Sequence, residues 1–164
     1  MDFFDVVKNR KSVREYSDRK IGKALIEKII DSGRVAATAR NEQPWEFIAT
    51  SDKEVMKKIC SMCPNAPFIK DASHLLAVFS KDTKYYLEDC SAATQNILLA
   101  IEALGLAGCW IAGDKKDYAE TVGNIFNVPR GYMLASMISV GYPKKPQEPK
   151  VKRPLKEVLH SGKW

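Results

Sequence analysis

The segment from residue 88 to residue 104, EDCSAATQNILLAIEAL, limits what this chain can fold into more than any other stretch. Its apolar residues recur at helical spacing, and Leu98 and Leu99 extend the apolar surface beyond a single stripe. The stripe consists of Ala93, Ile97, Ala100, Ile101 and Leu104. A helix that is apolar nearly all round must be buried on most sides. We therefore expect a central helix that other elements cover.

Four short segments predict strands. They are 45–50 (WEFIAT), 74–80 (HLLAVFS), 109–112 (CWIA) and 133–142 (MLASMISVGY). The continuous apolar run in 74–80 is typical of a strand that is buried on both of its faces.

Further helices are predicted between these strands. Segments 2–9 and 22–38 have helical spacing, a capping box of Ser51 and Glu54 marks another start, and Asp114 caps a helix that ends before residue 129. Because helices and strands are mixed without regular alternation, we expect an α+β fold. It is a sandwich in which helices flank a mixed, mostly antiparallel sheet.

The C-terminal segment 143–164 has a different composition. Pro143, Pro146 and Pro149 recur at every third position, which favours an extended arm, and Pro154 can begin a short terminal helix over 154–160. No linker or repeat divides the chain, and its 164 residues fit one domain, 1–164. An arm that leaves a domain in this way often reaches a partner.

The overall composition, 45% hydrophobic and 28% charged, is ordinary for a globular protein. No apolar run approaches the length needed to cross a bilayer, so we expect no membrane partner and a cytoplasmic location. The formal net charge is +6, and the cations are dense in 8–23 and in 144–156. This charge could favour nucleic acid, or the two basic ends could bind one small anion.

The four cysteines are too few for a disulfide framework. Cys60 and Cys63 form a C-x-x-C pair, which could be a redox pair or half of a zinc site. No second pair follows, and the only histidines are His74 and His160. We therefore favour thiols of the core or of a helix end, and we predict no metal site. A thiol or metal protein remains an alternative.

Three stretches could carry chemistry. In NRKSVREYS, Arg10 offers a planar fork for phosphate and Ser12 a hydroxyl donor, although the stretch could also be a solvated helix end. In ATARNEQPW, the amides of Asn41 and Gln43 could read the edge of a heterocycle, or the stretch could be a plain connecting loop. In GLAGCWIAG, small residues allow backbone to approach a flat ligand, or they simply stop a helix.

Four stretches together resemble the nitroreductase family of FMN-dependent oxidoreductases, in its short form. They are RKSVREYSDRKI, NEQPWEF, QNILLAIEALGLAGCWI and VGYPKKPQEPKVKRPLKEVLH, and they span nearly the whole chain in the family's order. The resemblance implies a nitroreductase-like sandwich, a homodimer with FMN sites at the subunit interface, and a C-terminal arm exchanged between the subunits.

The resemblance also implies roles for particular residues. Arg10 and Ser12 would grip the FMN phosphate and ribityl chain, with Lys11 less direct, and Arg14 would lie near the flavin N1 and O2 edge. Arg153 and Lys152, with Lys150 as a further candidate, would close the phosphate site from the C-terminal segment. Two other groups would meet the ring: Thr38, Asn41 and Gln43 from the other subunit, and Gly108, Trp110 and Ile111 from the same chain.

The activity implied is transfer of hydride from NADH or NADPH through flavin N5 to a small oxidised acceptor, such as a nitroaromatic or a quinone, by a ping-pong mechanism. No catalytic side chain is then required, because the cofactor carries the chemistry. The alternatives are other acceptors of the family (enones, halogenated substrates or free flavin) or a basic nucleic-acid-binding protein. We expect no nucleic-acid partner. The residue pattern does not distinguish NADH from NADPH.

Overall fold

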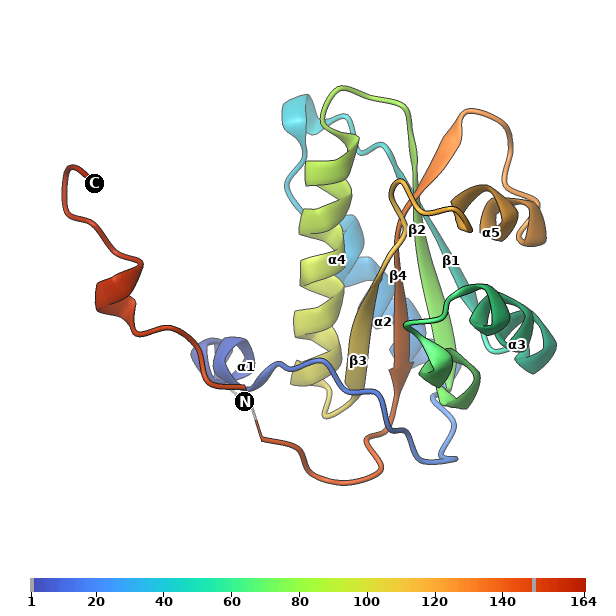
Figure 1. Cartoon of the computed structure of the whole chain (residues 1–164), viewed down its shortest axis with the longest axis horizontal. Helices are drawn as coiled ribbons and strands as arrows, with labels where there is room; N and C mark the ends of the chain where they lie inside the picture. Colours follow the sequence, from blue (N-terminus) through green and yellow to red (C-terminus); the bar gives the residue numbers. More distant parts are fainter. Residues whose placement is uncertain (1, 149) are drawn as a thin grey trace.

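The computed structural model describes residues 2–148 and 150–164. In chain order the elements are α1 (Phe3–Asn9), α2 (Lys23–Arg34), η1 (Ala39–Asn41), β1 (Trp45–Thr50), α3 (Lys53–Met62), η2 (Pro67–Asp71), β2 (His74–Lys81), α4 (Tyr86–Ala103), β3 (Ala107–Ala112), α5 (Ala119–Ile125), β4 (Tyr132–Gly141) and η3 (Leu155–Glu157). Figure 1 shows the strands as one sheet with helices on both sides and a C-terminal segment that extends away from it.

The strands form a four-stranded sheet in the order β1-β2-β4-β3, and every neighbouring pair is antiparallel. A single parallel bridge between Ser12 and Gly108 adds a short fifth neighbour at the outer edge of β3. The α+β sandwich is therefore confirmed, and this bridge is the parallel component of an otherwise antiparallel sheet.

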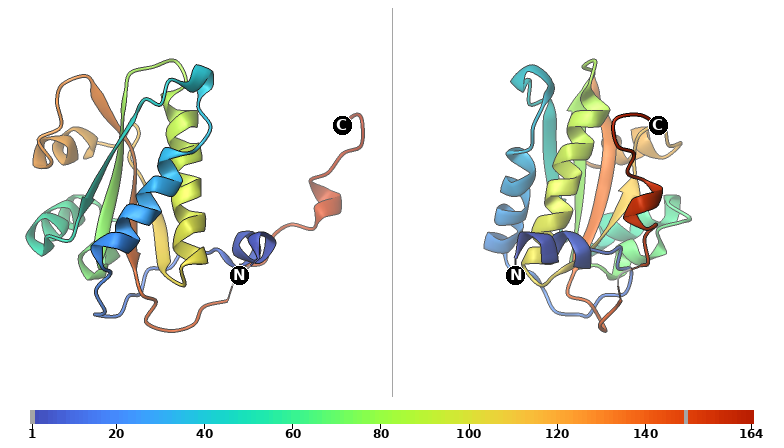
Figure 2. Two further views of the ribbon diagram at one scale, coloured as in Figure 1. Left: turned by 180° about the vertical axis from the view of Figure 1, so that it is seen from behind. Right: turned by 90° about the vertical axis from the view of Figure 1, so that its left-hand side faces the viewer.

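Strand β2 lies in the middle of the molecule and is covered on both faces. Leu75, Ala77 and Phe79 pack in one cluster with residues of α3 and α5, whereas Leu76 and Val78 pack in a second cluster with residues of α2 and α4. Successive side chains of a strand point to opposite faces, so a doubly covered strand must be apolar throughout. Figure 2 shows the resulting layers, with the sheet between the two helix pairs.

Helix α4 covers the sheet as the sequence predicts, and α2 packs closely against it. A β-carbon at Gly33 of α2 would lie 2.8 Å from the Ile97 side chain of α4. Helix α2 ends at Arg34, four residues before the predicted end at residue 38. Thr38 is already extended, and the next amide, at Ala39, donates to Asp89 of α4, so tertiary contacts draw the chain away from the helix axis.

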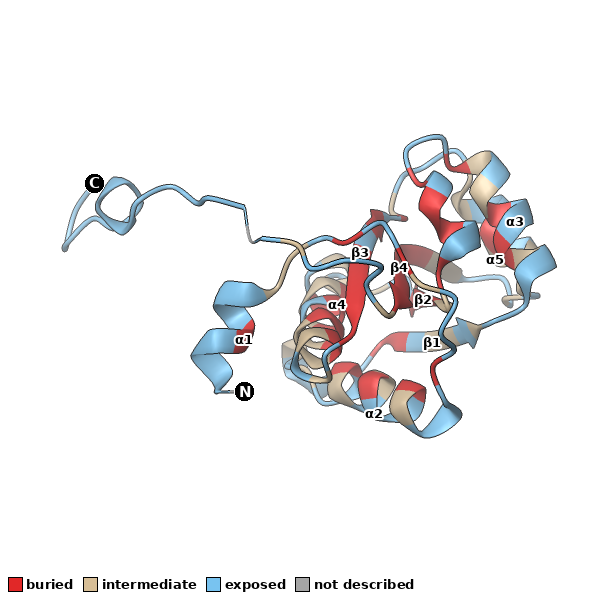
Figure 3. Cartoon of the chain, turned by 90° about the horizontal axis from the view of Figure 1, so that it is seen from below, coloured by how far each residue is buried: buried red, intermediate tan, exposed pale blue. Residues whose placement is uncertain are grey.

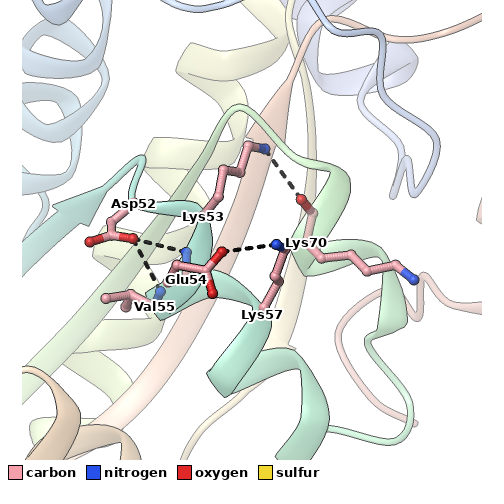
Figure 4. Close-up of polar contacts among 6 residues, drawn as sticks. All are labelled: Asp52, Lys53, Glu54, Val55, Lys57 and Lys70. Atoms are coloured by element: carbon pink, nitrogen blue, oxygen red, sulfur yellow. Dashed lines mark hydrogen bonds and ion pairs between the residues drawn. The ribbon is translucent and has the colours of Figure 1, made fainter.

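The capping box predicted at Ser51 is wrong, although the helix it announces exists. Asp52 is the N-cap, and its Oδ1 accepts from the backbone N–H groups of Glu54 (2.9 Å) and Val55 (3.3 Å), as Figure 4 shows. Glu54 does not reach back to the cap but pairs with Lys57 at 2.9 Å. Two candidate caps stand side by side in the sequence, and the longer acidic side chain takes the position.

Two further helix boundaries differ from the prediction. Asp114 does not cap α5, because its Oδ1 accepts from the Tyr86 hydroxyl at 2.5 Å and α5 begins only at Ala119. The terminal helix expected over 154–160 is reduced to the single 3-10 turn of η3. All residues of 150–164 are exposed in this chain (Figure 3), so no packing stabilises a longer helix there.

The two ends of the chain meet beside the sheet. Tyr16 and Pro143 form an antiparallel bridge, the Ser17 amide donates to Tyr142 O at 2.9 Å, and the Lys144 amide donates to Glu15 O at 3.1 Å. Beyond this junction the C-terminal segment leaves past β3, while β1 forms the opposite edge of the sheet (Figures 1 and 3). Among the described residues, no helix is both long and apolar enough to span a membrane.

Candidate functional site

The basic segment 10–14 is fixed to the outer edge of β3 by backbone contacts. The Val13 amide donates to Gly108 O at 3.0 Å, which places Ser12 beside Gly108 in the parallel bridge. A β-carbon at Gly108 would lie 3.1 Å from Ile101 Cδ1 and 3.2 Å from Ser139 O. Gly108 therefore allows β3 to pack against α4 and holds the basic segment, but it lies in neither of the hollows described below.

Tyr16 fixes the next turn of this segment to β4. Its side chain is buried, and its hydroxyl donates to Val13 O at 2.7 Å and lies 2.7 Å from Ser139 Oγ. Burial raises the pKa of Tyr16 well above its ordinary value, so the hydroxyl stays protonated. The ring occupies the space above Gly141, where a β-carbon would lie 2.7 Å from the Tyr16 ring.

A hollow of about 530 Å³, here called the basic hollow, lies where the two ends of the chain meet. Arg10 and Lys11 line it from the N-terminal side, together with Lys8, Ser12 and Arg14. Lys150 and Lys152 line it from the C-terminal side. Glu148 is the carboxylate among its lining residues, so cations predominate and the hollow favours an anion.

The cations of the basic hollow differ in their availability. Lys11 donates to Asn9 O at 3.1 Å and lies 3.8 Å from the Glu102 carboxylate, so part of its charge is already compensated. Arg10 forms the C-cap of α1, and within the described part of the chain its guanidinium makes no ion pair. The charge of Arg10 is therefore not compensated within the described residues, and its planar guanidinium can hold an anion through two hydrogen bonds.

Arg153 does not line the basic hollow in this structure. Its guanidinium donates to Glu157 O at 2.8 Å and lies 3.5 Å from the Glu157 carboxylate. The acid four residues further along the chain thus attracts the guanidinium. Of the C-terminal cations that the sequence analysis considered, the structure brings Lys150 and Lys152 to the hollow instead.

A second hollow of about 680 Å³, here called the aromatic hollow, adjoins the first, and Arg14 lines both. Its walls come from the end of α3, from η2, from β3 and from the loop before α5. Trp110 and Ile111 line it as expected, and Phe68 and Tyr118 are additional aromatic residues. The Arg14 guanidinium lies 5.6 Å from the centre of the Phe68 ring, within the range of a cation–π contact.

Sequence reasoning missed the wall formed by 62–68. Pro64 and Pro67 mark this stretch as a break in the chain, and no periodicity assigns it to an element. An amide and an aromatic residue, Asn65 and Phe68, stand beside these prolines and were the available signal. A polar and an aromatic side chain in a rigid turn are common features of a binding loop.

The two thiols and the phenol of the aromatic hollow are protonated at neutral pH. Burial raises the pKa of the Cys63 thiol to about 11, and that of Tyr118 to about 12. Burial also raises the pKa of Cys109, against the opposing effect of the Arg14 guanidinium. Because nucleophilic attack needs a thiolate or an activated hydroxyl, each of these side chains would have to lose its proton before it could attack a bound molecule. In their neutral form they bind and shape a ligand.

The loop containing Thr38, Asn41 and Gln43 lies in neither hollow of this chain. Arg40, Asn41 and Gln43 all have positive φ, at 55°, 57° and 48°, a conformation that non-glycine residues rarely adopt. The Gln43 amide donates to Thr38 Oγ1 at 3.3 Å, and the Asp89 carboxylate anchors the loop through the Ala39 amide at 2.9 Å. The loop is thus held in a defined, strained shape.

The two hollows fit a ligand with an anionic end and a planar end. Charge-assisted hydrogen bonds from Arg10 and Ser12 suit a phosphate, and the aromatic hollow, whose volume is typical of small-molecule sites, suits a flat heterocycle. Arg14 lies between them, where it can face the edge of such a ring. A flavin mononucleotide has this construction, so the residues present fit it.

Comparisons with known proteins point the same way. A sequence model of the nitroreductase family matches residues 7–86 and 61–142. A protein of Methanothermobacter thermautotrophicus, provisionally named NADH dehydrogenase/NAD(P)H nitroreductase, is 35% identical over 149 residues, which cover 87% of this chain and 78% of the relative. Iodotyrosine deiodinase of Thermotoga neapolitana is 31% identical over 185 residues, with 95% of both chains covered.

A solved structure from Parabacteroides distasonis, with the same provisional name as the archaeal relative, superimposes with a TM-score of 0.94 at 34% identity and covers 99% of this chain and 98% of its own. Fold, hollows and relatives together define an NAD(P)H-dependent flavin oxidoreductase. The chain belongs to the nitroreductase family.

Proposed function

We propose that this enzyme binds FMN and uses it to transfer hydride from NADH or NADPH to a small oxidised acceptor. The observation that carries the proposal is the meeting of Arg10 and Ser12 with Lys150 and Lys152 around one hollow, which Arg14 connects to a hollow of planar-ligand size. Arg10, Ser12, Lys150 and Lys152 would hold the phosphate. The ring would lie against Trp110, Ile111 and the 62–68 wall.

Bound FMN would supply the hydride chemistry, in a ping-pong cycle in which nicotinamide leaves before the acceptor enters the same face. The residues of the chain would bind the cofactor and orient its ring. The Arg14 guanidinium places positive charge beside the ring and so favours its anionic form, and the buried, neutral side chains of Cys63 and Cys109 help to keep water from the hollow.

The acceptor that we propose first is a nitroaromatic or quinone, flat molecules that can stack over a ring. The deiodinase relative favours a second candidate, reductive removal of halogen from an aromatic substrate. A screen of nitroaromatics, quinones and iodotyrosine against NADH and NADPH separates the two. The four free cysteines and the need for NAD(P)H favour the cytoplasm as the location.

We further propose that the active form is a homodimer that exchanges its C-terminal arms. The arm exposes Leu155, Val158 and Leu159 and leaves its own body past β3, away from β1. The outer edge of β1 pairs with no strand within the described residues, and beside it lies a groove of about 970 Å³, here called the edge groove, with Ile21, Ile26 and Ile30 among its lining residues. The exposed apolar side chains of the arm suit the isoleucines of the groove, which charged residues such as Lys23 and Asp31 also line. A second copy of the chain would bring arm and groove together. The dimer would bring the 38–43 loop of one copy to the ring of the other.

FMN binding tests the core of the proposal. The purified protein should be yellow or take up FMN stoichiometrically, and NADH or NADPH should bleach it under anaerobic conditions. A colourless protein that does not alter the absorbance or fluorescence of added FMN would overturn the assignment.

A further inference from the structure

We propose that Cys60 and Cys63 form a reversible disulfide in the wall of the aromatic hollow, through which the enzyme reduces external disulfides. The proposal rests on the proposed function, because the electrons would come from NAD(P)H through the bound flavin. In the reduced state both residues are thiols, and in the oxidised state they have lost two electrons and two protons. An external disulfide R–S–S–R is reduced to two thiols in the same exchange.

The position of the pair follows from the end of α3. Cys63 is the C-cap of this helix and is only 2% exposed, and it lines the aromatic hollow together with Arg14 and Trp110. Cys60 lies one turn earlier, and the Cys63 amide donates to Cys60 O at 3.1 Å, which closes that turn. One member of the pair therefore faces the site where the flavin ring is proposed to bind.

The two thiols differ in accessibility. Cys60 is partly exposed and lies outside both hollows, whereas Cys63 is buried. Thiol–disulfide exchange needs this division, since one sulfur must meet an external partner while the other resolves the mixed disulfide from within. The exchange would pass through Cys60–S–S–R, which Cys63 then attacks to release the second R–SH.

The bond requires a rotation of the Cys60 side chain and a small movement of the backbone at the end of α3. Residues three apart on a helix have β-carbons roughly 5–6 Å apart, slightly beyond the span of a disulfide. In this structure the Cys60 thiol donates to Pro67 O at 3.4 Å, so the pair is reduced and Cys60 Sγ must turn away from that carbonyl. The turn at Cys63 has non-helical φ and ψ angles of −111° and 80°, so the end of the helix is already unwound toward the hollow.

The return step balances without a further reactant. The disulfide takes one hydride equivalent from NAD(P)H, delivered through the flavin site, and one proton from solvent, giving two thiols and NAD(P)⁺. The remaining cysteines provide internal references. Cys109 also lines the aromatic hollow and is the competing partner for Cys63, whereas Cys90 packs in the cluster on the other face of the sheet.

The first test follows the disulfide itself. The holoprotein is equilibrated in glutathione buffers of increasing oxidised fraction, free thiols are alkylated, and the peptide 59–70 is weighed by mass spectrometry. As the oxidised fraction rises, we expect this peptide to lose both alkyl groups and to weigh two hydrogens less than the free dithiol peptide in the wild type and in Cys109→Ser, but not in Cys60→Ser. Full alkylation of the peptide across the whole series, or a bond between Cys63 and Cys109, would overturn the proposal.

The second test follows the electrons. Anaerobic titration of the oxidised holoenzyme with NADH should consume two equivalents per protomer in the wild type and one in Cys60→Ser, and NADH-dependent reduction of hydroxyethyl disulfide should be lost in this variant while quinone turnover is kept. If the disulfide forms but the wild type consumes only one equivalent of NADH, electrons do not pass from the flavin to the cysteine pair. The further inference is then wrong, and the proposed function stands. If FMN does not bind at all, the proposed function fails, and this link fails with it.

Discussion

The hydroxyl of Tyr16 lies 2.7 Å from Oγ of Ser139, which joins the N-terminal basic segment to the central strand β4. The same hydroxyl donates to Val13 O at 2.7 Å. Through these bonds the interior of the sheet determines where Ser12 and Arg14 lie. The basic hollow is therefore an extension of the core rather than a feature of a loose terminus.

We expect Tyr16→Phe to destabilise the protein by about 1–3 kcal/mol, because Ser139 Oγ and Val13 O lose a partner in a buried place. Urea unfolding measures the loss. Tyr85→Phe is the control, since within the described residues no hydrogen bond involves the Tyr85 hydroxyl, and its stability should be unchanged. Equal stability of the Tyr16 variant would show that the hydroxyl does not join the segment to β4.

We expect Arg10→Ala to weaken FMN binding by roughly tenfold or more, since a hydrogen bond to a charged group contributes about 1.5–3 kcal/mol. Quenching of FMN fluorescence gives the dissociation constant. Arg130→Ala removes an exposed arginine that lines neither hollow, and this variant should bind FMN normally. An unchanged affinity in Arg10→Ala would remove Arg10 from the phosphate site.

The C-terminal cations give a matched comparison. Lys150 and Lys152 line the basic hollow, and Arg153 faces Glu157 instead. The double variant Lys150→Ala/Lys152→Ala should therefore lose FMN affinity and show a weaker dependence of that affinity on salt. Arg153→Ala should change the affinity for FMN little. The reverse result would mean that the arm adopts another conformation when the cofactor binds.

His74 makes stability depend on pH in a defined direction. Burial, and secondly the nearby Lys53 ammonium, lower the pKa of His74 below its ordinary value of about 6.5. The unfolded chain therefore takes up the proton first, so this contribution to stability is present above about pH 6.5 and is lost as the pH falls through the folded pKa. We expect His74→Gln to flatten the pH dependence of the melting temperature between pH 5 and 7, and the exposed His160→Gln to leave it unchanged.

Deletion of 155–164 tests the exchanged arm while keeping both lysines of the basic hollow. We expect a protein that is monomeric by light scattering and that retains FMN poorly, because the 38–43 loop of a partner would be absent. Ala49→Arg alters the edge groove, which would receive the arm of the other subunit. The added charge should also weaken the dimer. A deletion variant that remains dimeric would show that the arms do not hold the subunits together.

The sequence predicted the sheet and its central helix because their patterns are long and unambiguous. The apolar run of β2 and the stripe of α4 can be buried in few other ways. The helix starts were less predictable. Ser51 and Asp52 are both good caps, and the local sequence does not show which of them begins α3. Asp114 is also a good cap, but its carboxylate accepts a hydrogen bond from Tyr86 of another element, which the local sequence does not show either.

Some residues of the candidate site could also be predicted from the sequence, and others could not. Arg10, Ser12, Arg14 and Trp110 stand in recognisable motifs, and the structure brings them to the two hollows. Phe68 comes from a segment without periodicity, and Tyr118 precedes α5 instead of lying in the helix predicted to begin at Asp114. Only the tertiary fold therefore brings them to the hollow. Arg153 stays out of the basic hollow because it forms an ion pair with Glu157. A prediction based only on which side chains bind phosphate does not include this competing acid.

The close contact between Gly141 and the Tyr16 ring also constrains how this protein can change over time. While the tyrosine is present, any side chain at position 141 would have to displace an aromatic ring that is itself bonded to the sheet. A descendant that replaces Tyr16 with a smaller residue frees position 141 to vary, so substitutions at the two positions should occur together or in that order.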